Sequence, residues 1–119
     1  MAEFLPTVAS ELKAYIVIND SLKMGKGKIA SQAGHAVAMM VEHVVCGERA
    51  LWRRYKDCGQ PKIVLKASQE QMNEIAQVAG AFVIRDAGRT QISENSLTAI
   101  CFAPQAAYPH SIIPSLKLL

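Results

Sequence analysis

The sequence has few cysteines, and they form no pattern in which they could act together. Three of the 119 residues are cysteine, and Cys46, Cys58 and Cys101 lie far apart without a CxxC pair. An odd, scattered set is typical of reduced thiols in a cytosolic protein rather than of a disulfide framework. The spacing also excludes the usual zinc frameworks, and we expect no metal site and no cofactor.

Long apolar stretches and a leader pattern are lacking as well. No hydrophobic run approaches the roughly 18 residues that a membrane span needs. The first residues carry neither a basic region nor a long apolar segment of the kind found in secretory signals. We therefore expect a cytoplasmic protein without a membrane partner.

Internal repeats and Pro/Gly/Ser-rich linkers are absent too, which favours one domain. Half of the residues are hydrophobic and 19% are charged, a composition typical of globular proteins. We expect an N-terminal extension over residues 1–13 and a single domain over residues 14–119.

The charge balance is mild, with 13 basic and 10 acidic residues and a net charge of +3. It permits an anionic partner without requiring one. The basic residues gather in two groups, which comprise Lys23, Lys26 and Lys28, and Arg49, Arg53, Arg54 and Lys56. Each group reads either as a solvated face or as a contact for a phosphate-rich ligand.

Hydrophobic periodicity predicts alternating strands and helices. The predicted strands cover residues 15–18, 62–66, 82–84 and 97–102, and the predicted helices cover 26–46, 48–57 and a segment from Ser68 to Gly80. Ser68 and Gln71 form a capping box, and the buried face of that last helix is predicted to contain Met72, Ile75, Ala76 and Ala79. This order predicts the α/β class, as a three-layer α/β/α sandwich with a mixed four-stranded sheet.

The loop after the first predicted strand is rich in lysine and glycine and leads directly into a helix. Glycines let backbone N–H groups approach an anion, and a helix start adds partial positive charge. The loop is no Walker A motif, because the GxxxxGK[ST] spacing is absent and Ile29 stands where a hydroxyl would bind magnesium. A phosphate or oxyanion site is one reading of this loop, and a solvated turn is the other.

Two further polar groups stand near predicted ligand-binding positions. Lys28, Gln32 and His35 fall on one face of the helix that follows the loop. Asp86 follows the third predicted strand, at the edge where α/β proteins bind ligands. No GxSxG elbow and no local thiol signature supports a covalent nucleophile.

Taken together, these motifs resemble the peptidyl-tRNA hydrolase 2 family over about residues 13–103. The resemblance rests on the motifs NDSLKMGKGK from Asn19, CGQPK from Cys58 and DAGRTQI from Asp86, together with Gln32, His35, Trp52 and Thr98. It implies an α/β fold and hydrolysis of the ester that joins a peptide to the 3′ end of tRNA, which returns free tRNA to translation. It also implies peptidyl-tRNA as a partner and leaves a homodimer open.

The resemblance assigns roles to individual residues. Those implied to be catalytic are Lys28, Asp86, Thr90 and Thr98, and those implied to bind substrate are Lys23, Lys26, Gln32, His35 and Arg89. A metal-independent attack by water fits these residue types, with Lys28 stabilising the oxyanion. Asp86 either orients and deprotonates the water or positions Lys28, because an aspartate with a pKa of about 3.9 is a weak base at pH 7.

Two other functions remain open on the same fold. One is a non-catalytic tRNA- or RNA-binding module, which would need the lysines but not Asp86. The other is a protein-interaction module that uses the basic helix over residues 49–56.

Overall fold

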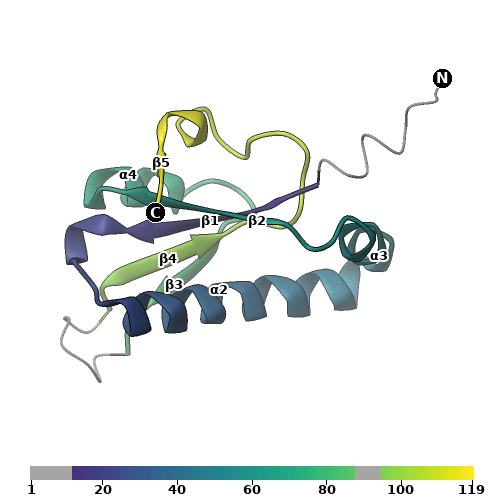
Figure 1. Ribbon diagram of the computed structural model, residues 1–119, viewed down its shortest axis with the longest axis horizontal. Coiled ribbons are helices and arrows are strands. Elements are labelled where there is room, and N and C mark those ends of the chain that lie inside the picture. The colour runs from purple at the N-terminus through teal and green to yellow at the C-terminus, as the bar shows by residue number, and fades with distance from the viewer. Residues whose placement is uncertain (1–11, 88–94) are drawn as a thin grey trace.

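The computed structural model describes residues 12–87 and 95–119, and within them the chain forms a mixed sheet with helices packed against it (Figure 1). The strands are β1 (Ala14–Asn19), β2 (Lys62–Ala67), β3 (Phe82–Arg85), β4 (Leu97–Cys101) and β5 (Lys117–Leu118). The helices are α2 (Lys26–Gly47), α3 (Arg49–Asp57) and α4 (Gln69–Ile75), with short 3-10 turns at η2 (Asp20–Leu22) and η3 (Ile113–Ser115). The α/β class and the mixed sheet are thus confirmed.

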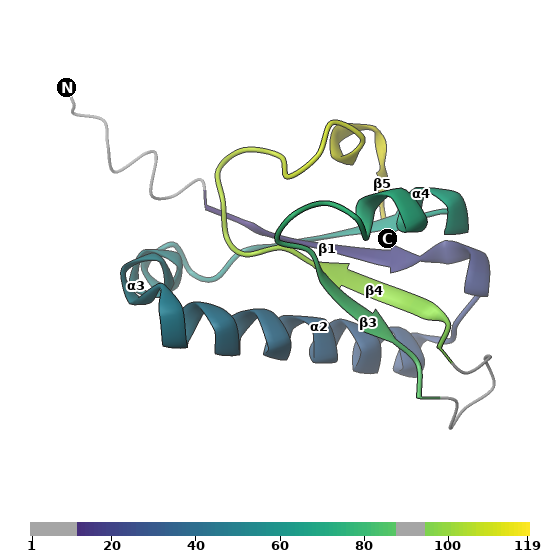
Figure 2. The same ribbon diagram turned by 180° about the vertical axis from the view of Figure 1, so that it is seen from behind.

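Strand β1 lies at the centre of the sheet, whose order is β3-β4-β1-β2-β5. It pairs parallel with β2 and antiparallel with β4, and all six of its residues are buried. Its side chains alternate between two apolar clusters: Ile16 and Ile18 pack with residues of α2 and α3, whereas Tyr15 and Val17 pack with residues of α4 and the C-terminal segment. Figures 1 and 2 show α2 along one side of the strands and α4 on the other.

Helix α2 follows the predicted boundaries closely. Its buried positions are Gln32, Ala36, Met40 and Val44, which recur every fourth residue and form one stripe against the sheet. No helix among residues 12–87 and 95–119 is long and apolar enough to cross a membrane.

The prediction of a four-stranded sheet was wrong, because the described chain contains a fifth strand. β5 has only two residues, and it pairs antiparallel with β2 through Leu65 with Leu118 and Lys66 with Lys117. A two-residue strand has no periodicity of its own. β5 forms because its backbone groups pair with the unpaired N–H and C=O groups at the edge of β2. The two strands are about fifty positions apart in the chain, so no local pattern predicts this pairing.

The helix after Ser68 begins as predicted and ends earlier. The capping box of Ser68 and Gln71 is present, with both reciprocal hydrogen bonds. The helix stops at Ile75, and tighter turns follow in which the Gln77 and Val78 N–H groups bond three residues back. This tightening turns Ala79 away from the core, so the prediction that Ala79 is buried was wrong.

Burial perturbs two ionisable side chains at the end of the sheet near α3. Tyr55 is fully buried and donates a 2.9 Å hydrogen bond to the Pro61 carbonyl, and Cys101 is fully buried in β4. Loss of solvation, together with a smaller effect of the nearby Cys101, raises the pKa of Tyr55 to about 12. Burial likewise raises the pKa of Cys101 to about 12, against smaller opposing effects of the Phe102 backbone and Lys62.

Both shifts predict a loss of stability at alkaline pH. The unfolded chain loses these protons near pH 9.0 and 10.0, whereas the folded chain holds them up to about pH 12, so the free energy of unfolding falls as pH rises through this window. Between pH 8 and pH 11 we expect Cys101 alone to account for about 2–3 kcal/mol. Urea unfolding of the wild type and Cys101→Ala at both pH values measures this, and an equal loss in the two proteins would contradict the assignment to Cys101.

Candidate active site

A buried ion pair joins the start of α2 to the end of β3. Lys28 lies in the first turn of α2, and its Nζ donates to Oδ1 of Asp86, the residue that follows β3. Only 10% of the Lys28 side chain and 3% of the Asp86 side chain are exposed. Removing both charges from water is costly, and apolar side chains would fill the same space without that cost. The pair therefore favours a chemical role for these two residues.

A β-bulge beside this pair redirects Thr98. Ile84 of β3 is opposite Ala99 of β4, but the next residue, Arg85, is opposite Leu97, so Thr98 is the extra residue on β4. The bulge places two successive β4 residues, Thr98 and Ala99, on the side of the sheet that faces α2. The Thr98 hydroxyl thereby reaches Gln32, one turn of α2 after Lys28.

The polar contact between Thr98 and Gln32 is short and fully enclosed. Thr98 has no exposed surface, and its Oγ1 lies 2.6 Å from Gln32 Oε1 and 3.2 Å from the Ile84 carbonyl oxygen. The hydroxyl has one proton to donate, and the shorter contact to Gln32 is the better hydrogen bond. In this structure Thr98 holds Gln32 in place and does not present its hydroxyl to solvent.

The beginning of α2 leaves backbone donors without a side-chain cap. Its N-cap is Gly25, which makes no side-chain hydrogen bond, and the first turn contains no acidic residue. The first N–H groups of a helix have no partner within the helix and attract anions. Lys26 is exposed in this same turn, so positive charge and free donors coincide.

The remaining predicted site residues lie at different places. Gln32 is buried, whereas His35, one turn further along α2, is exposed. Lys23 is exposed in the loop before α2, where its Nζ lies 3.5 Å from the Asp20 carboxylate. Arg89 and Thr90 lie outside the described residues.

Asn19 is a polar anchor that was not among the predicted site residues. It is the last residue of β1, it is 1% exposed, and its Nδ2 donates to Gln69 Oε1 at 2.7 Å and to the Leu97 carbonyl at 2.8 Å. Its Oδ1 accepts the Ser21 N–H at 2.9 Å. Asn19 thus ties η2, α4 and β4 together next to Thr98. The signal that could have identified it is a polar residue directly after a buried β-branched run.

Groups that could hold a metal are not found in the described part of the chain. No three His, Cys, Asp or Glu side chains of residues 12–87 and 95–119 lie close enough together for a metal ion. No disulfide joins any two of Cys46, Cys58 and Cys101, which all lie in this part of the chain.

A charged lysine held beside a carboxylate and an uncapped helix start is typical of a site that stabilises developing negative charge. Comparison with known proteins identifies the family to which the chain belongs. The sequence model of the family "Peptidyl-tRNA hydrolase PTH2" matches residues 12–119, and the chain belongs to this family. The predicted resemblance to the peptidyl-tRNA hydrolase 2 family is therefore confirmed.

Individual relatives come from archaea and animals. The chain is 40% identical over 111 residues to "Peptidyl-tRNA hydrolase" of Methanococcus maripaludis, a match that covers 87% of this chain and 96% of that protein. It is 39% identical over 105 residues to "Peptidyl-tRNA hydrolase 2, mitochondrial" of Bos taurus, which covers 83% of this chain. The match spans only 59% of the bovine protein and 54% of a similar Drosophila melanogaster protein, "Probable peptidyl-tRNA hydrolase 2".

The enclosed contact between Thr98 and Gln32 predicts a stability effect. Thr98→Val preserves the shape of the side chain but leaves the buried Gln32 carbonyl oxygen without its donor, which costs about 1–3 kcal/mol. Thr98→Ser retains the hydroxyl and is the matched control. Chemical denaturation measures both, and a Thr98→Val protein as stable as Thr98→Ser would show that the hydrogen bond contributes nothing.

Proposed function

We propose that the protein hydrolyses the ester bond between an N-blocked peptide and the 3′ end of tRNA, without a metal ion, and releases free peptide and tRNA. The observation that carries the proposal is the buried Lys28–Asp86 ion pair beside the uncapped start of α2. Membership of the peptidyl-tRNA hydrolase family supports the substrate class.

The reaction requires attack on a carbonyl carbon and departure of the ribose oxygen. A water molecule adds to the carbonyl carbon and loses one proton, and the carbonyl oxygen becomes negatively charged. The bond to the ribose oxygen then breaks as that oxygen takes up one proton, which balances the proton that the water lost. The Lys28 ammonium is placed to stabilise the oxyanion. Its low exposure strengthens the interaction, because charges attract more strongly where water is excluded.

Asp86 acts mainly as the positioning partner of Lys28. One of its carboxylate oxygens is engaged with the ammonium, and its backbone is held by hydrogen bonds to Ser96 and Asn95. Gln32 and Thr98 are further polar side chains on this part of the α2–sheet interface, and Thr98 orients Gln32. Thr90 and Arg89 remain predicted site residues on the basis of the family motif.

Binding of the tRNA uses the positive end of α2. Lys23 and Lys26 are exposed on either side of Gly25, at the start of the helix whose first N–H groups lack a side-chain cap. His35 is exposed further along the same helix, in line with Lys28 at i, i+7, and stays a predicted substrate-binding residue. A cytoplasmic location, expected from the scattered cysteines, and a homodimer remain predictions.

Loss of either partner of the ion pair should abolish most activity. We expect Lys28→Ala and Asp86→Asn each to lower kcat/KM at least about tenfold, and loss of one oxyanion donor typically costs 10²–10³. The measurement is release of free tRNA from N-acetyl-aminoacyl-tRNA with chelator present. Lys56→Ala on α3 removes an exposed lysine and is the control.

A double variant separates chemistry from folding. Removing one partner leaves a buried charge alone and destabilises the protein, whereas Lys28→Met combined with Asp86→Asn removes both charges. We expect the double variant to regain stability over Lys28→Met and to remain inactive. Tight salt-sensitive tRNA binding by a wild-type protein that releases no tRNA would instead indicate a binding module.

Gly27 tests whether an anion approaches the backbone at the start of α2. A Cβ added at Gly27 or at Gly34 meets no atom within 4 Å, so the fold itself requires neither glycine. Both replacements by Ala should leave stability unchanged or raise it by up to about 1 kcal/mol. Only Gly27→Ala should raise KM for peptidyl-tRNA, by about threefold or more, and equal KM values for the two variants would argue against anion binding at this turn.

A further inference from the structure

A cavity with a positively charged lining lies on the other side of Asn19 from the Lys28–Asp86 pair. It is open to solvent and has a volume of about 540 Å³, and its lining includes three lysines and three serines, namely Lys23, Lys66, Lys117, Ser21, Ser68 and Ser115. The only carboxylate in the lining is Asp20, which pairs with Lys23 at 3.5 Å. The lining therefore has an excess of two positive charges.

The two lysines without a carboxylate partner in the described chain, Lys66 and Lys117, lie next to each other on neighbouring strands. Lys66 of β2 and Lys117 of β5 are directly opposite in the antiparallel ladder, so their side chains project from the same face. Like charges at directly opposite positions repel each other. Neither lysine has a carboxylate within 4.0 Å among residues 12–87 and 95–119. An anion bound between the two ammonium groups would relieve this repulsion.

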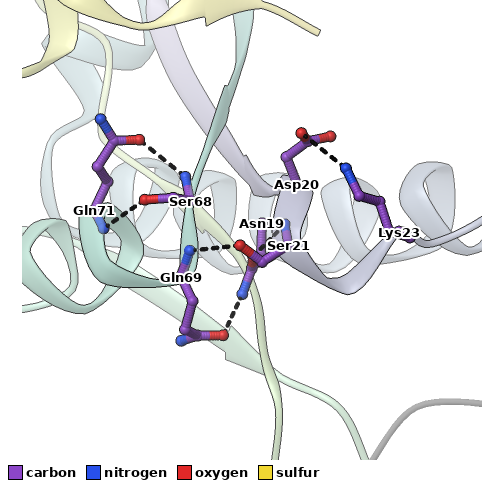
Figure 3. Close-up of polar contacts among 7 residues, drawn as sticks. All are labelled: Asn19, Asp20, Ser21, Lys23, Ser68, Gln69 and Gln71. Carbon is purple, nitrogen blue, oxygen red and sulfur yellow. Dashed lines mark hydrogen bonds and ion pairs between the residues drawn. The ribbon is translucent and has the colours of Figure 1, made fainter.

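The serine hydroxyls add hydrogen-bond donors to the same lining. Figure 3 shows Ser21 Oγ accepting the Gln69 N–H and Ser68 Oγ accepting the Gln71 N–H, at 2.9 Å and 3.2 Å. Each hydroxyl is thus oriented as an acceptor, and its own proton has no acceptor within the described chain. Two ammonium groups with two hydroxyl donors match the oxygens of a phosphate group.

The cavity lies on the same sheet edge as the Lys28–Asp86 pair. β1, β2 and β3 run in the same direction, so Asn19, Ala67 and Asp86 all lie at one edge. Because β4 and β1 separate β3 from β2, the cavity and the pair are about 14 Å apart at an interstrand spacing of about 4.8 Å. Successive nucleotides of a stacked DNA strand advance about 3.4 Å along the helix axis, so a stacked strand covers this span with about four nucleotides and a more extended strand with fewer.

We propose that this cavity binds a backbone phosphate of the tRNA, a few nucleotides before the 3′ end that carries the peptide. The proposal rests on the proposed function, because it presumes that the 3′ end lies at the Lys28–Asp86 pair. Lys66 and Lys117 are the residues that hold the phosphate, and Asn19 holds the cavity and the active site at a constant separation through Ser21, Gln69 and the Leu97 carbonyl.

The test compares two variants with the same change in net charge. Lys66→Gln with Lys117→Gln, and Arg53→Gln with Lys56→Gln, each lower the net charge from +3 to +1. The second pair lies on α3, beyond the far end of the 22-residue helix α2 (Figure 1). Dissociation constants for labelled deacylated tRNA are measured over a series of salt concentrations.

We expect the Lys66/Lys117 variant to bind tRNA about fivefold more weakly or worse. The slope of log K against log salt should fall by nearly one, since each phosphate contact contributes about 0.7–0.9. The Arg53/Lys56 variant should stay within about twofold of the wild type. Equal losses in both variants would reduce the effect to net charge and overturn the proposal, as would wild-type binding by the Lys66/Lys117 variant.

Folding and the proposed hydrolysis are tested separately. Lys117→Gln alone changes one exposed residue near the chain end, so it keeps the test valid if the double variant fails to fold. Wild-type protein that releases no tRNA, but binds it through Lys66 and Lys117, would refute the proposed hydrolysis and leave the phosphate site standing. Tight binding of inorganic phosphate that the variant loses, with an unchanged tRNA dissociation constant, would assign the cavity to a small ligand and overturn the proposal.

Discussion

The burial of β1 on both faces is the constraint on which the rest of the structure depends. All six of its residues are buried, so apolar elements must cover both sides of the sheet, and the strand contains no charged residue. The chain leaves the core at Asn19, whose amide is satisfied by contacts to three other segments. Because β2 and β3 run in the same direction as β1, their polar ends gather at the same edge.

The candidate site uses this edge and the rigidity of α2. A long helix packed along the sheet presents Lys28 to Asp86, and a bulge in β4 turns Thr98 toward Gln32. Lys28, Gln32 and Thr98 are therefore held by packed elements, and Asp86 follows directly on β3, which lowers the reorganisation needed when charge develops in the reaction. The same edge continues past Asn19 to the pair of opposed lysines on β2 and β5.

Much of this arrangement could be predicted from local patterns. The stripe on α2, the capping box at Ser68 and the main strands follow from periodicity and turn chemistry, and their positions are confirmed to within a few residues. The helical spacing also placed Lys28 and Gln32 on one face. His35 lies about 60° around the helix from Gln32, on the side away from the buried stripe, and it is therefore exposed. β5 and the early end of α4 were missed, because neighbouring segments decide both.

The sequence by itself determined the α/β class, the order of the elements and the motifs that mark the family, because these depend on residues close together in the chain. Only the tertiary structure decided that Lys28 meets Asp86, that Thr98 is the extra residue of a bulge and that Lys66 faces Lys117. Each of these arrangements joins residues that are at least twelve positions apart in the chain. Strand register determines the bulge at Thr98 and the pairing of Lys66 with Lys117, and the packing of α2 against the sheet determines that Lys28 contacts Asp86. No local sequence pattern encodes either strand register or this packing.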